Sequence, residues 1–260
     1  MNKIVKLMSL TLVGLVPLLT MPAQASIEVF LSDILFPSVG FDDNDSVEIV
    51  LDGELPNTCY EIGSAQVRRV GNVFWVSQYS TLRDVQGCDE DQQLPEVLDW
   101  PVNYSNVITL GKLKTGDYKV AFIGPNGEAQ YRPLNIAPAT GSSIDEKLYA
   151  PVTSAFVPEI MVESDDVQVA LTGVLKKSCV RMKEDDRDLV QKIGNVLVIL
   201  PELELLPQRE CFSTLRPIHQ IVSLGHLEPG RYLLHVRSAG GRAVNRTFSV
   251  IKNPNDPRSE

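Results

Sequence analysis

The sequence contains few of the residues from which catalytic sites are usually built. Its 260 residues include only three histidines, His219, His226 and His235, and all three lie in the second half of the chain. Their spacing fits no zinc-binding pattern, and the chain has neither a G-x-S-x-G motif nor a comparable Cys–His arrangement. We therefore expect a protein that is not an enzyme and that has no cofactor or metal site. The histidines are expected to be isolated residues, exposed or half-buried.

Long apolar segments are absent beyond the first 25 residues. Residues 1–6 are basic and residues 7–19 are apolar, and Ala23 and Ala25 form an A-x-A site before Ser26. This order is typical of a cleavable signal peptide, because the apolar stretch is short for a membrane span; a retained anchor helix is the alternative. We expect residues 1–25 to be removed, no membrane insertion, and a periplasmic or secreted product.

Positive charge is also scarce. The chain has 24 lysines and arginines against 33 aspartates and glutamates, which gives a net charge of −9. Nucleic acids and anionic lipid surfaces repel such a protein, so we expect neither as a partner. Residues 26–136 contain 17 acidic and 7 basic residues, whereas residues 148–260 contain 14 of each. The sequence leaves open whether the acidic first part docks on the arginines of the second or is simply solvated.

The chain repeats itself. Residues 45–53 align with residues 165–173, residues 71–73 with 194–196, and residues 110–118 with 224–232. The displacement between the copies changes only in loop-like regions, where insertions are tolerated. Chance does not keep paired cysteines, Gly-Asn dipeptides and Gly-x-Tyr triplets in the same order, so we interpret the chain as a tandem duplication.

The repeat also divides the chain. We predict a first domain at residues 26–136, a linker of small residues, Pro and Gly at residues 137–147, a second domain at residues 148–252 and a flexible tail at residues 253–260.

Each predicted domain contains two of the four cysteines. An even number of cysteines in an exported protein favours disulfides over metal binding or catalysis. The duplication then predicts one bridge within each copy, Cys59–Cys88 and Cys179–Cys211.

Each copy supplies about seven short β-branched or alternating segments separated by turn signals. The dipeptides Gly71-Asn72 and Gly194-Asn195 each introduce an apolar run, as in a tight hairpin. No long segment has a helical period. This layout predicts an all-β protein made of antiparallel β-sandwiches.

One local motif resembles a known superfamily. Residues 113–118 and 227–232 share the form Leu-x-x-Gly-x-Tyr just before an alternating strand. The motif is similar to the tyrosine corner of immunoglobulin-like and fibronectin type III-like sandwiches, in which the tyrosine hydroxyl bonds back to the upstream backbone. The resemblance implies two tandem immunoglobulin-like domains, with Tyr118 and Tyr232 in that structural role. It implies a fold and no particular function.

Several large or charged side chains are candidates for a partner surface. Trp100 and Tyr104 in the first copy have no aromatic counterparts in the second, and Arg237, Arg242 and Arg246 lie on or around the last hairpin of the second copy. Aromatic residues and arginines are favoured at interfaces. Charges at strand edges also discourage edge-to-edge pairing, which is an alternative explanation of the arginines.

Two other features have plainer explanations. Trp75 also lacks an aromatic counterpart, but we expect it in a core. The acidic run at residues 41–46 lacks the Gly and the distal Glu of a calcium loop and is expected to be a solvated turn.

We expect a non-catalytic periplasmic or secreted protein that presents loops or strand edges of its tandem sandwiches to another protein or a glycan. The alternatives are a secreted enzyme inhibitor and a pilus-type periplasmic chaperone. An inhibitor would need an exposed reactive loop, for which residues 94–101 and 205–207 are candidates. The oligomeric state stays open.

Overall fold

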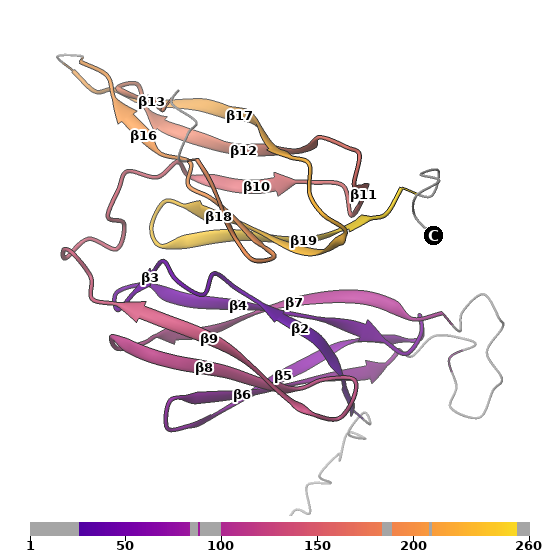
Figure 1. Cartoon of the computed structure of the whole chain (residues 1–260). Coiled ribbons are helices and arrows are strands. Elements are labelled where there is room, and N and C mark those ends of the chain that lie inside the picture. The colour runs from indigo at the N-terminus through magenta and orange to yellow at the C-terminus, as the bar shows by residue number, and fades with distance from the viewer. Residues whose placement is uncertain (1–25, 84–87, 89–99, 184–188, 208–209, 254–260) are drawn as a thin grey trace, which may run out of the picture.

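The computed structural model describes residues 26–83, 88, 100–183, 189–207 and 210–253. The predicted signal peptide, most of the predicted tail and most of the candidate loop at residues 94–101 lie outside this part of the chain. Within it every regular element is a strand (Figure 1), and no helix long and apolar enough to cross a membrane is found there. The prediction of an all-β protein is confirmed.

The described residues of the first half form nine strands. Their bounds are β1 (Ser26–Val29), β2 (Leu31–Leu35), β3 (Phe41–Asp42), β4 (Ser46–Leu55), β5 (Tyr60–Val70), β6 (Val73–Leu82), β7 (Val102–Lys112), β8 (Gly116–Ile123) and β9 (Ala129–Ala137). One sheet has the order β1-β6-β8-β9-β3, with β5 also paired to β6, and the other has the order β2-β4-β7.

The described residues of the second half form ten strands. Their bounds are β10 (Val152–Phe156), β11 (Ile160–Val162), β12 (Val167–Lys177), β13 (Val180–Met182), β14 (Val190–Ile193), β15 (Val196–Ile199), β16 (Leu203–Leu205), β17 (Ser213–Gly225), β18 (Gly230–Ser238) and β19 (Arg242–Ile251). One sheet has the order β11-β19-β18-β15-β14, a second has the order β10-β12-β17, and β13 pairs with β16.

The two halves share one strand order. The path β3-β9-β8-β6-β5 of the first half corresponds to β11-β19-β18-β15-β14 of the second, and β2-β4-β7 corresponds to β10-β12-β17. Even the irregularities correspond, because the register shifts in β2 and β4 have counterparts in β10 and β12. The repeat seen in the sequence is therefore also a repeat of topology.

The prediction of purely antiparallel sheets is wrong in one respect. Strand β6 pairs with β8 in parallel, and β15 pairs with β18 in the same way. The short strands β3 and β11 also pair in parallel, with β9 and β19. The path of the chain explains the pairing of β6 with β8. Strand β7 comes between β6 and β8 in the sequence but belongs to the opposite sheet. Because the direction reverses from β6 to β7 and again from β7 to β8, β6 and β8 run the same way. The sheets of immunoglobulin domains are antiparallel. Here β5, the antiparallel hairpin partner of β6, pairs with β6 outside the strand path that continues to β8.

Each half has a hydrophobic core of its own. In the first half it includes Phe122, Leu134 and Ile136, and in the second it includes Phe248 and Leu197, all of them at most 1% exposed. The sheets stack in Figure 1 as four layers, with β2-β4-β7 of the first half facing the sheet of β18 and β19 in the second. The faces of these two inner sheets meet at the junction described below.

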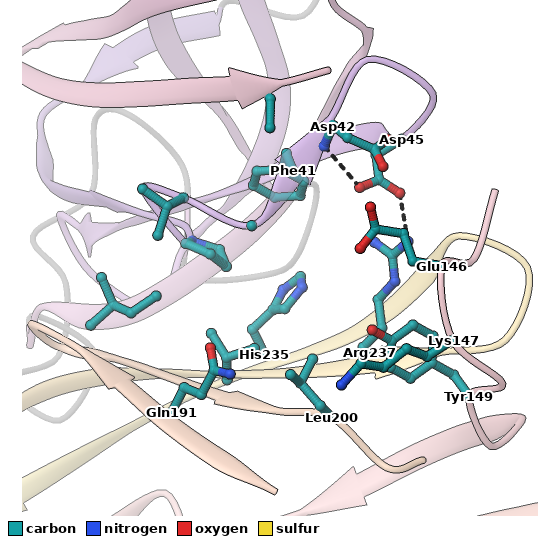
Figure 2. Close-up of a pocket in the computed structure, with 16 residues that line it drawn as sticks. Phe41, Asp42, Asp45, Glu146, Lys147, Tyr149, Gln191, Leu200, His235 and Arg237 are labelled. Carbon is teal, nitrogen blue, oxygen red and sulfur yellow. Dashed lines mark hydrogen bonds and ion pairs between the residues drawn. The ribbon is translucent and has the colours of Figure 1, made fainter. Parts of the chain in front are cut away.

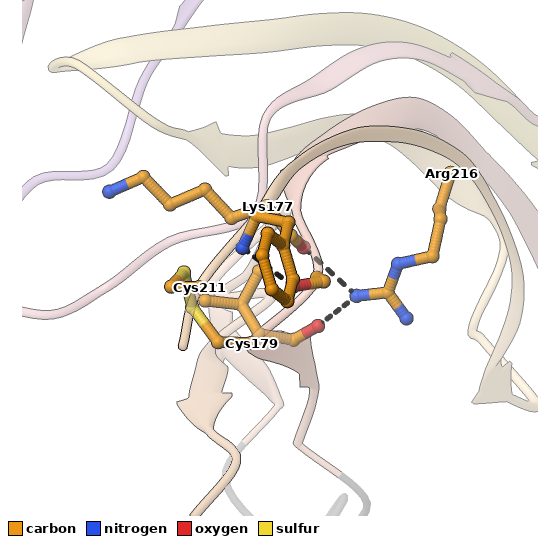
Figure 3. Close-up of a disulfide and its surroundings, with 7 residues drawn as sticks. Lys177, Cys179, Cys211 and Arg216 are labelled. Carbon is orange, nitrogen blue, oxygen red and sulfur yellow. Dashed lines mark hydrogen bonds between the residues drawn. A yellow bond between two sulfur atoms is a disulfide. The ribbon is translucent and has the colours of Figure 1, made fainter. Parts of the chain in front are cut away.

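Both predicted disulfides, Cys59–Cys88 and Cys179–Cys211, are present, so all four cysteines are paired. Beside the second bridge the Arg216 guanidinium donates to the backbone carbonyl oxygens of Lys177 and Val180, which ties β17 to the segment that carries Cys179 (Figure 3). Two disulfides are typical of a protein from an oxidising environment outside the cytoplasm.

The Leu-x-x-Gly-x-Tyr motifs have the same geometry in both halves. The Tyr118 hydroxyl donates to the carbonyl oxygen of Lys114 at 2.9 Å, and the Tyr232 hydroxyl donates to that of Glu228 at 2.8 Å. Both rings are buried in the cores. Each tyrosine thus ties the start of its strand, β8 or β18, to the loop before it.

Candidate functional site at the junction of the two halves

The junction has an apolar centre built by strands that bury both faces. Leu35 on β2 and Val50 on β4 pack there against Val196, Val198 and Leu233 of β15 and β18. The alternate side chains of β15 and β18 point into the core of the second half. Because both faces of these strands are covered, the run Val196–Ile199 is apolar at every position.

An arginine clamps one end of this centre. The Arg231 guanidinium on β18 donates to the Asp52 carboxylate on β4 from Nε at 3.1 Å and from Nη2 at 2.9 Å, and its remaining donors reach the hydroxyls of Ser249 and Thr247. Burial raises the pKa of Asp52, and the hydrogen bonds and charge of Arg231 oppose that rise. All three nitrogens of the guanidinium are engaged, so Arg231 serves to hold the halves together.

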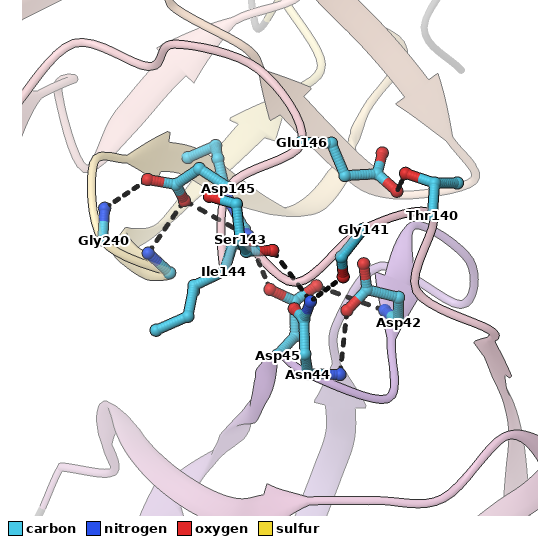
Figure 4. A network of polar contacts seen from close by, with 12 residues as sticks. Asp42, Asn44, Asp45, Thr140, Gly141, Ser143, Ile144, Asp145, Glu146 and Gly240 are labelled. Atoms are coloured by element: carbon cyan, nitrogen blue, oxygen red, sulfur yellow. Dashed lines mark hydrogen bonds and ion pairs between the residues drawn. The ribbon is translucent and has the colours of Figure 1, made fainter.

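A second ion pair closes the opposite end. Arg237 on β18 pairs with Asp45 and also lies 3.6 Å from Asp145. The Asp145 carboxylate accepts from the backbone N–H groups of Gly240 and Gly241, and the Asn44 side chain donates to the carbonyl oxygen of Ser143 at 2.8 Å (Figure 4). The segment between the halves is therefore tied to both of them.

Between the two ion pairs a polar chain crosses the junction. The His235 Nδ1 lies 2.7 Å from the Asn245 side-chain oxygen, and the Asn245 amide donates to Glu48 at 3.0 Å. Since Asn245 presents its oxygen to the ring, Nδ1 carries the proton of a neutral imidazole. Burial, with a contribution from Arg237, lowers the pKa of His235 to about 4, and burial raises the pKa of Glu48.

A cavity of about 300 Å³ lies at the Arg237 end of the junction (Figure 2). The Phe41 ring contacts His235 edge-on on one side, and Glu146, Lys147 and Tyr149 lie on the other. The cavity is small, and the charged groups of Asp45 and Arg237 at its wall already pair with each other.

A larger groove of about 820 Å³ lies at the Arg231 end. One wall is β7, which contributes Asn103, Tyr104, Ser105 and Val107, and the other wall comes from β10, β11 and β19. The groove exposes apolar side chains, since Ile160 is 65% and Val107 is 46% exposed. Within the described residues β7 pairs only with β4, so the backbone groups of its outer edge have no strand partner.

The structure brings together only two of the residues predicted for a partner surface. Tyr104 and Arg246 line the same groove, whereas Arg237 lies in the buried ion pair beside the small cavity. Trp100 is 68% exposed just before β7, and Arg242 is exposed at the turn between β18 and β19. The predicted set is thus spread over several surfaces.

Tyr104 differs from the other candidates because it is buried. It is 5% exposed, and its hydroxyl has no hydrogen-bond partner among the described residues. Burial raises its pKa, and the charge of Asp52 raises it further. Tyr104 therefore lines the groove as part of the core of the first half.

Three further sequence expectations need correction. Asp42 and Asp45 of the acidic run are 6% and 2% exposed, because they shape a turn that docks on Arg237. His235, expected to be exposed or half-buried, is buried by the junction. Trp75, expected in a core, is half-buried on the outer face of β6, where it contacts Tyr131.

The described residues contain no group of three or more His, Cys, Asp or Glu side chains arranged to hold a metal ion. The carboxylates near the acidic run bind protein groups instead: Asp43, for example, accepts from the Thr115 hydroxyl and from the Ala139 N–H.

Sequence reasoning missed the groove residues Phe156 and Ile160 and the clamp between Asp52 and Arg231. One signal was present. The uninterrupted apolar run at residues 196–200, between a Gly-Asn turn and a proline, indicates a strand with two covered faces. Which face of the other half covers it could not be predicted from local pattern.

The chain matches no protein-family model, no curated protein and no solved structure in the comparisons made with each.

Proposed function

We propose that the protein is a non-catalytic interaction protein of the periplasm or the extracellular space. In this proposal its two halves are tandem immunoglobulin-like domains that dock into one body, and the groove beside β7 receives a partner protein. The observation that carries the proposal is this groove, where the edge of β7, which has no strand partner among the described residues, adjoins exposed apolar side chains and an arginine.

The assignment to immunoglobulin-like domains is supported by the shared strand order of the halves and by the two tyrosine hydrogen bonds. The parallel pairings of β6 with β8 and of β15 with β18 depart from that fold. The proposed domains are therefore a variant of that fold. The second strand of the hairpin β5-β6 pairs in parallel with β8, and the second strand of the hairpin β14-β15 pairs in parallel with β18.

The proposed binding mode is strand addition. A partner segment in extended conformation pairs with the outer edge of β7, and its main-chain hydrogen bonds supply affinity. Alternate side chains of that segment point into the groove, where Ile160 and Val107 provide apolar contact. Arg246, whose Nη1 donates only to the Asn245 carbonyl oxygen among the described residues, is available for a carbonyl or carboxylate of the partner.

Site-specific photo-crosslinking tests this proposal. A photoreactive side chain is placed at Val107 or Ile160 in the groove, at Val70 as an exposed control, or at Leu205 in the candidate inhibitor loop. The disulfide-bonded chain is then exposed to periplasmic and culture fractions of the source cells. We expect one protein to be captured from Val107 and Ile160 and not from Val70, and we expect the variant Ile160→Glu to weaken its binding about tenfold.

Equal capture from Val70, or no capture from the groove positions, would contradict the proposal. Capture from Leu205 alone would favour the inhibitor. Among proteins captured from the groove, a protein that the chain delivers to a surface assembly would favour a chaperone over a stable complex.

A further inference from the structure

Two surfaces meet at the junction inside the chain, and each of them is repeated once at an end of the molecule. Across the first half the pairing register aligns Leu35, Val50 and Val107 in one row on the outer face of β2-β4-β7. The first two side chains of this row are 5% and 2% exposed, because the second half covers them. This row is the part of the first half that receives the second.

The second half carries the same row without a cover. The register aligns Phe156, Ala170 and Ile221 on the outer face of β10-β12-β17, at the positions that correspond to Leu35, Val50 and Val107. Phe156 is 67% and Ile221 is 71% exposed.

Leu215 and Val174 extend this face along β17 and β12, and they are 77% and 38% exposed. In Figure 1 the layer of β10, β12 and β17 lies at the end of the molecule away from the first half. Thr172 and His219 lie on this face between Ile221 and Val174, and nothing else in the described part of the chain covers it.

The complementary surface is repeated in the same way. In the second half Val196, Val198 and Leu233 enter the junction, and the register places Val73, Trp75 and Lys119 at the corresponding positions of β6 and β8. In Figure 1 these strands form the outermost layer at the other end of the molecule.

The substitutions within this second surface are mixed: Lys119 replaces the apolar Leu233, whereas two polar positions become apolar. Tyr131 stands where the second half has Asn245, and Ile123 stands where it has Arg237. Tyr131 is 48% and Ile123 is 39% exposed, and the Tyr131 ring lies 5.8 Å from the Trp75 ring. Aromatic and aliphatic side chains, with Lys119 Nζ 5.9 Å from the centre of the Tyr131 ring, are thus present at the end opposite the face of Ile221.

We propose that copies of this chain associate head to tail. The β10-β12-β17 face of one copy docks on the β6-β8-β9 face of the next and repeats the arrangement that joins the halves within one chain. The two surfaces differ from each other, so the contact is heterologous and a pair of docked copies retains one free face of each kind. Such contacts add copies in series until a ring closes or the filament ends.

The repeated contact is weaker than the internal one. Thr172 stands where the junction has Asp52, and Asp117 stands where it has Arg231, so this clamp is missing. The halves within a chain are also joined covalently, which raises their effective concentration, whereas separate copies are not. Association is therefore expected to depend strongly on concentration and to strengthen with salt, because salt screens the net negative charge of the copies.

Sedimentation velocity of the chain, purified with both disulfides formed, tests this proposal from micromolar to near-millimolar concentrations. Two variants each block one face, Ile221→Glu at one end and Tyr131→Glu at the other, and Leu205→Glu is a matched control at another exposed apolar position. We expect the unmodified chain and Leu205→Glu to form a growing series of oligomers, and each blocked variant to associate at least about tenfold more weakly. Circular dichroism verifies that each variant is folded.

An equal mixture of the two blocked variants distinguishes this arrangement from a symmetric dimer. Each copy in the mixture retains one competent face of the opposite kind, so we expect dimers and no larger species. Monomers at every concentration for the unmodified chain, or oligomers unaffected by Ile221→Glu, would overturn the proposal. A mixture that stays monomeric would also overturn it, and dimers formed by one blocked variant alone would indicate a contact between identical faces instead.

Discussion

His235 is an ionisable side chain that the junction buries, and its hydrogen bond to Asn245 requires a neutral ring. Its pKa is lowered from an ordinary value of 6.5 to about 4. Above pH 6.5 the ring is neutral in both the folded and the unfolded chain. Between pH 6.5 and 4 only the unfolded chain takes up the proton, so folding loses stability as the pH falls.

This linkage predicts that His235 lowers the free energy of unfolding by about 3 kcal/mol between pH 6.5 and pH 4. Urea unfolding of the chain and of the variant His235→Gln at several pH values measures the effect. Burial raises the pKa values of Asp52 and Glu48, and these groups act in the opposite direction, so the difference between the two proteins isolates His235. Parallel pH profiles would contradict the assignment.

The clamp between Asp52 and Arg231 is the second prediction at the scale of residues. The side chains of Asp52 and Arg231 are 10% and 28% exposed, so removing one leaves its partner charged and poorly solvated. A double-mutant cycle with Asp52→Asn and Arg231→Gln is expected to give a coupling energy of roughly 2 kcal/mol. The same cycle on the exposed pair Arg181–Glu204 is the control and should give less than about 1 kcal/mol. Equal coupling energies would show that burial does not strengthen the clamp.

The alternating side chains of strand β4 contribute to two different apolar clusters. Its inward side chains, Ile49 among them, fill the first core, and its outward Val50 reaches the centre of the junction. The corresponding outward residue of β12 is Ala170, which lies on the free face of the second half. The two positions therefore have equivalent backbones and different surroundings.

We predict that Val50→Asn lowers the free energy of unfolding by roughly 2–3 kcal/mol, because it removes buried apolar surface and places an amide in an apolar centre. Ala170→Asn, measured at low concentration, is expected to change it by less than about 0.5 kcal/mol. Small-angle scattering should show a wider distribution of shapes for Val50→Asn only. Similar effects of both substitutions would indicate that the junction does not form in solution.

Local pattern predicted most elements but not their partners. The strands around Val47 and Val167, the hairpins at the Gly-Asn turns and both disulfides follow from alternation, turn chemistry and the repeat. The position of Trp75 on an outer face does not, because a β-strand presents large side chains to both faces and only tertiary contacts show which face is covered. The parallel pairing of β6 with β8 likewise depends on which sheet β7 joins.

At the scale of the whole molecule, the charge asymmetry of the sequence has a structural counterpart in the junction. Acidic side chains of the first half, Asp45 and Asp52, meet Arg237 and Arg231 of the second. The sequence showed the excess charge, but only the fold selects which carboxylates dock. The groove beside β7 arises from the same docking, because its walls come from both halves.

The most direct test of the proposed function is hydrogen–deuterium exchange of the disulfide-bonded chain, alone and in complex with the partner captured by crosslinking. Strand addition predicts that binding slows exchange along residues 102–112, where the outer edge of β7 gains hydrogen bonds, and at residues 156–160 in the opposite wall of the groove. Exchange in β5, on the far side of the first half, should be unchanged. Protection confined to residues 205–207, or to the hairpin around Arg242, would contradict the account and place the binding site elsewhere.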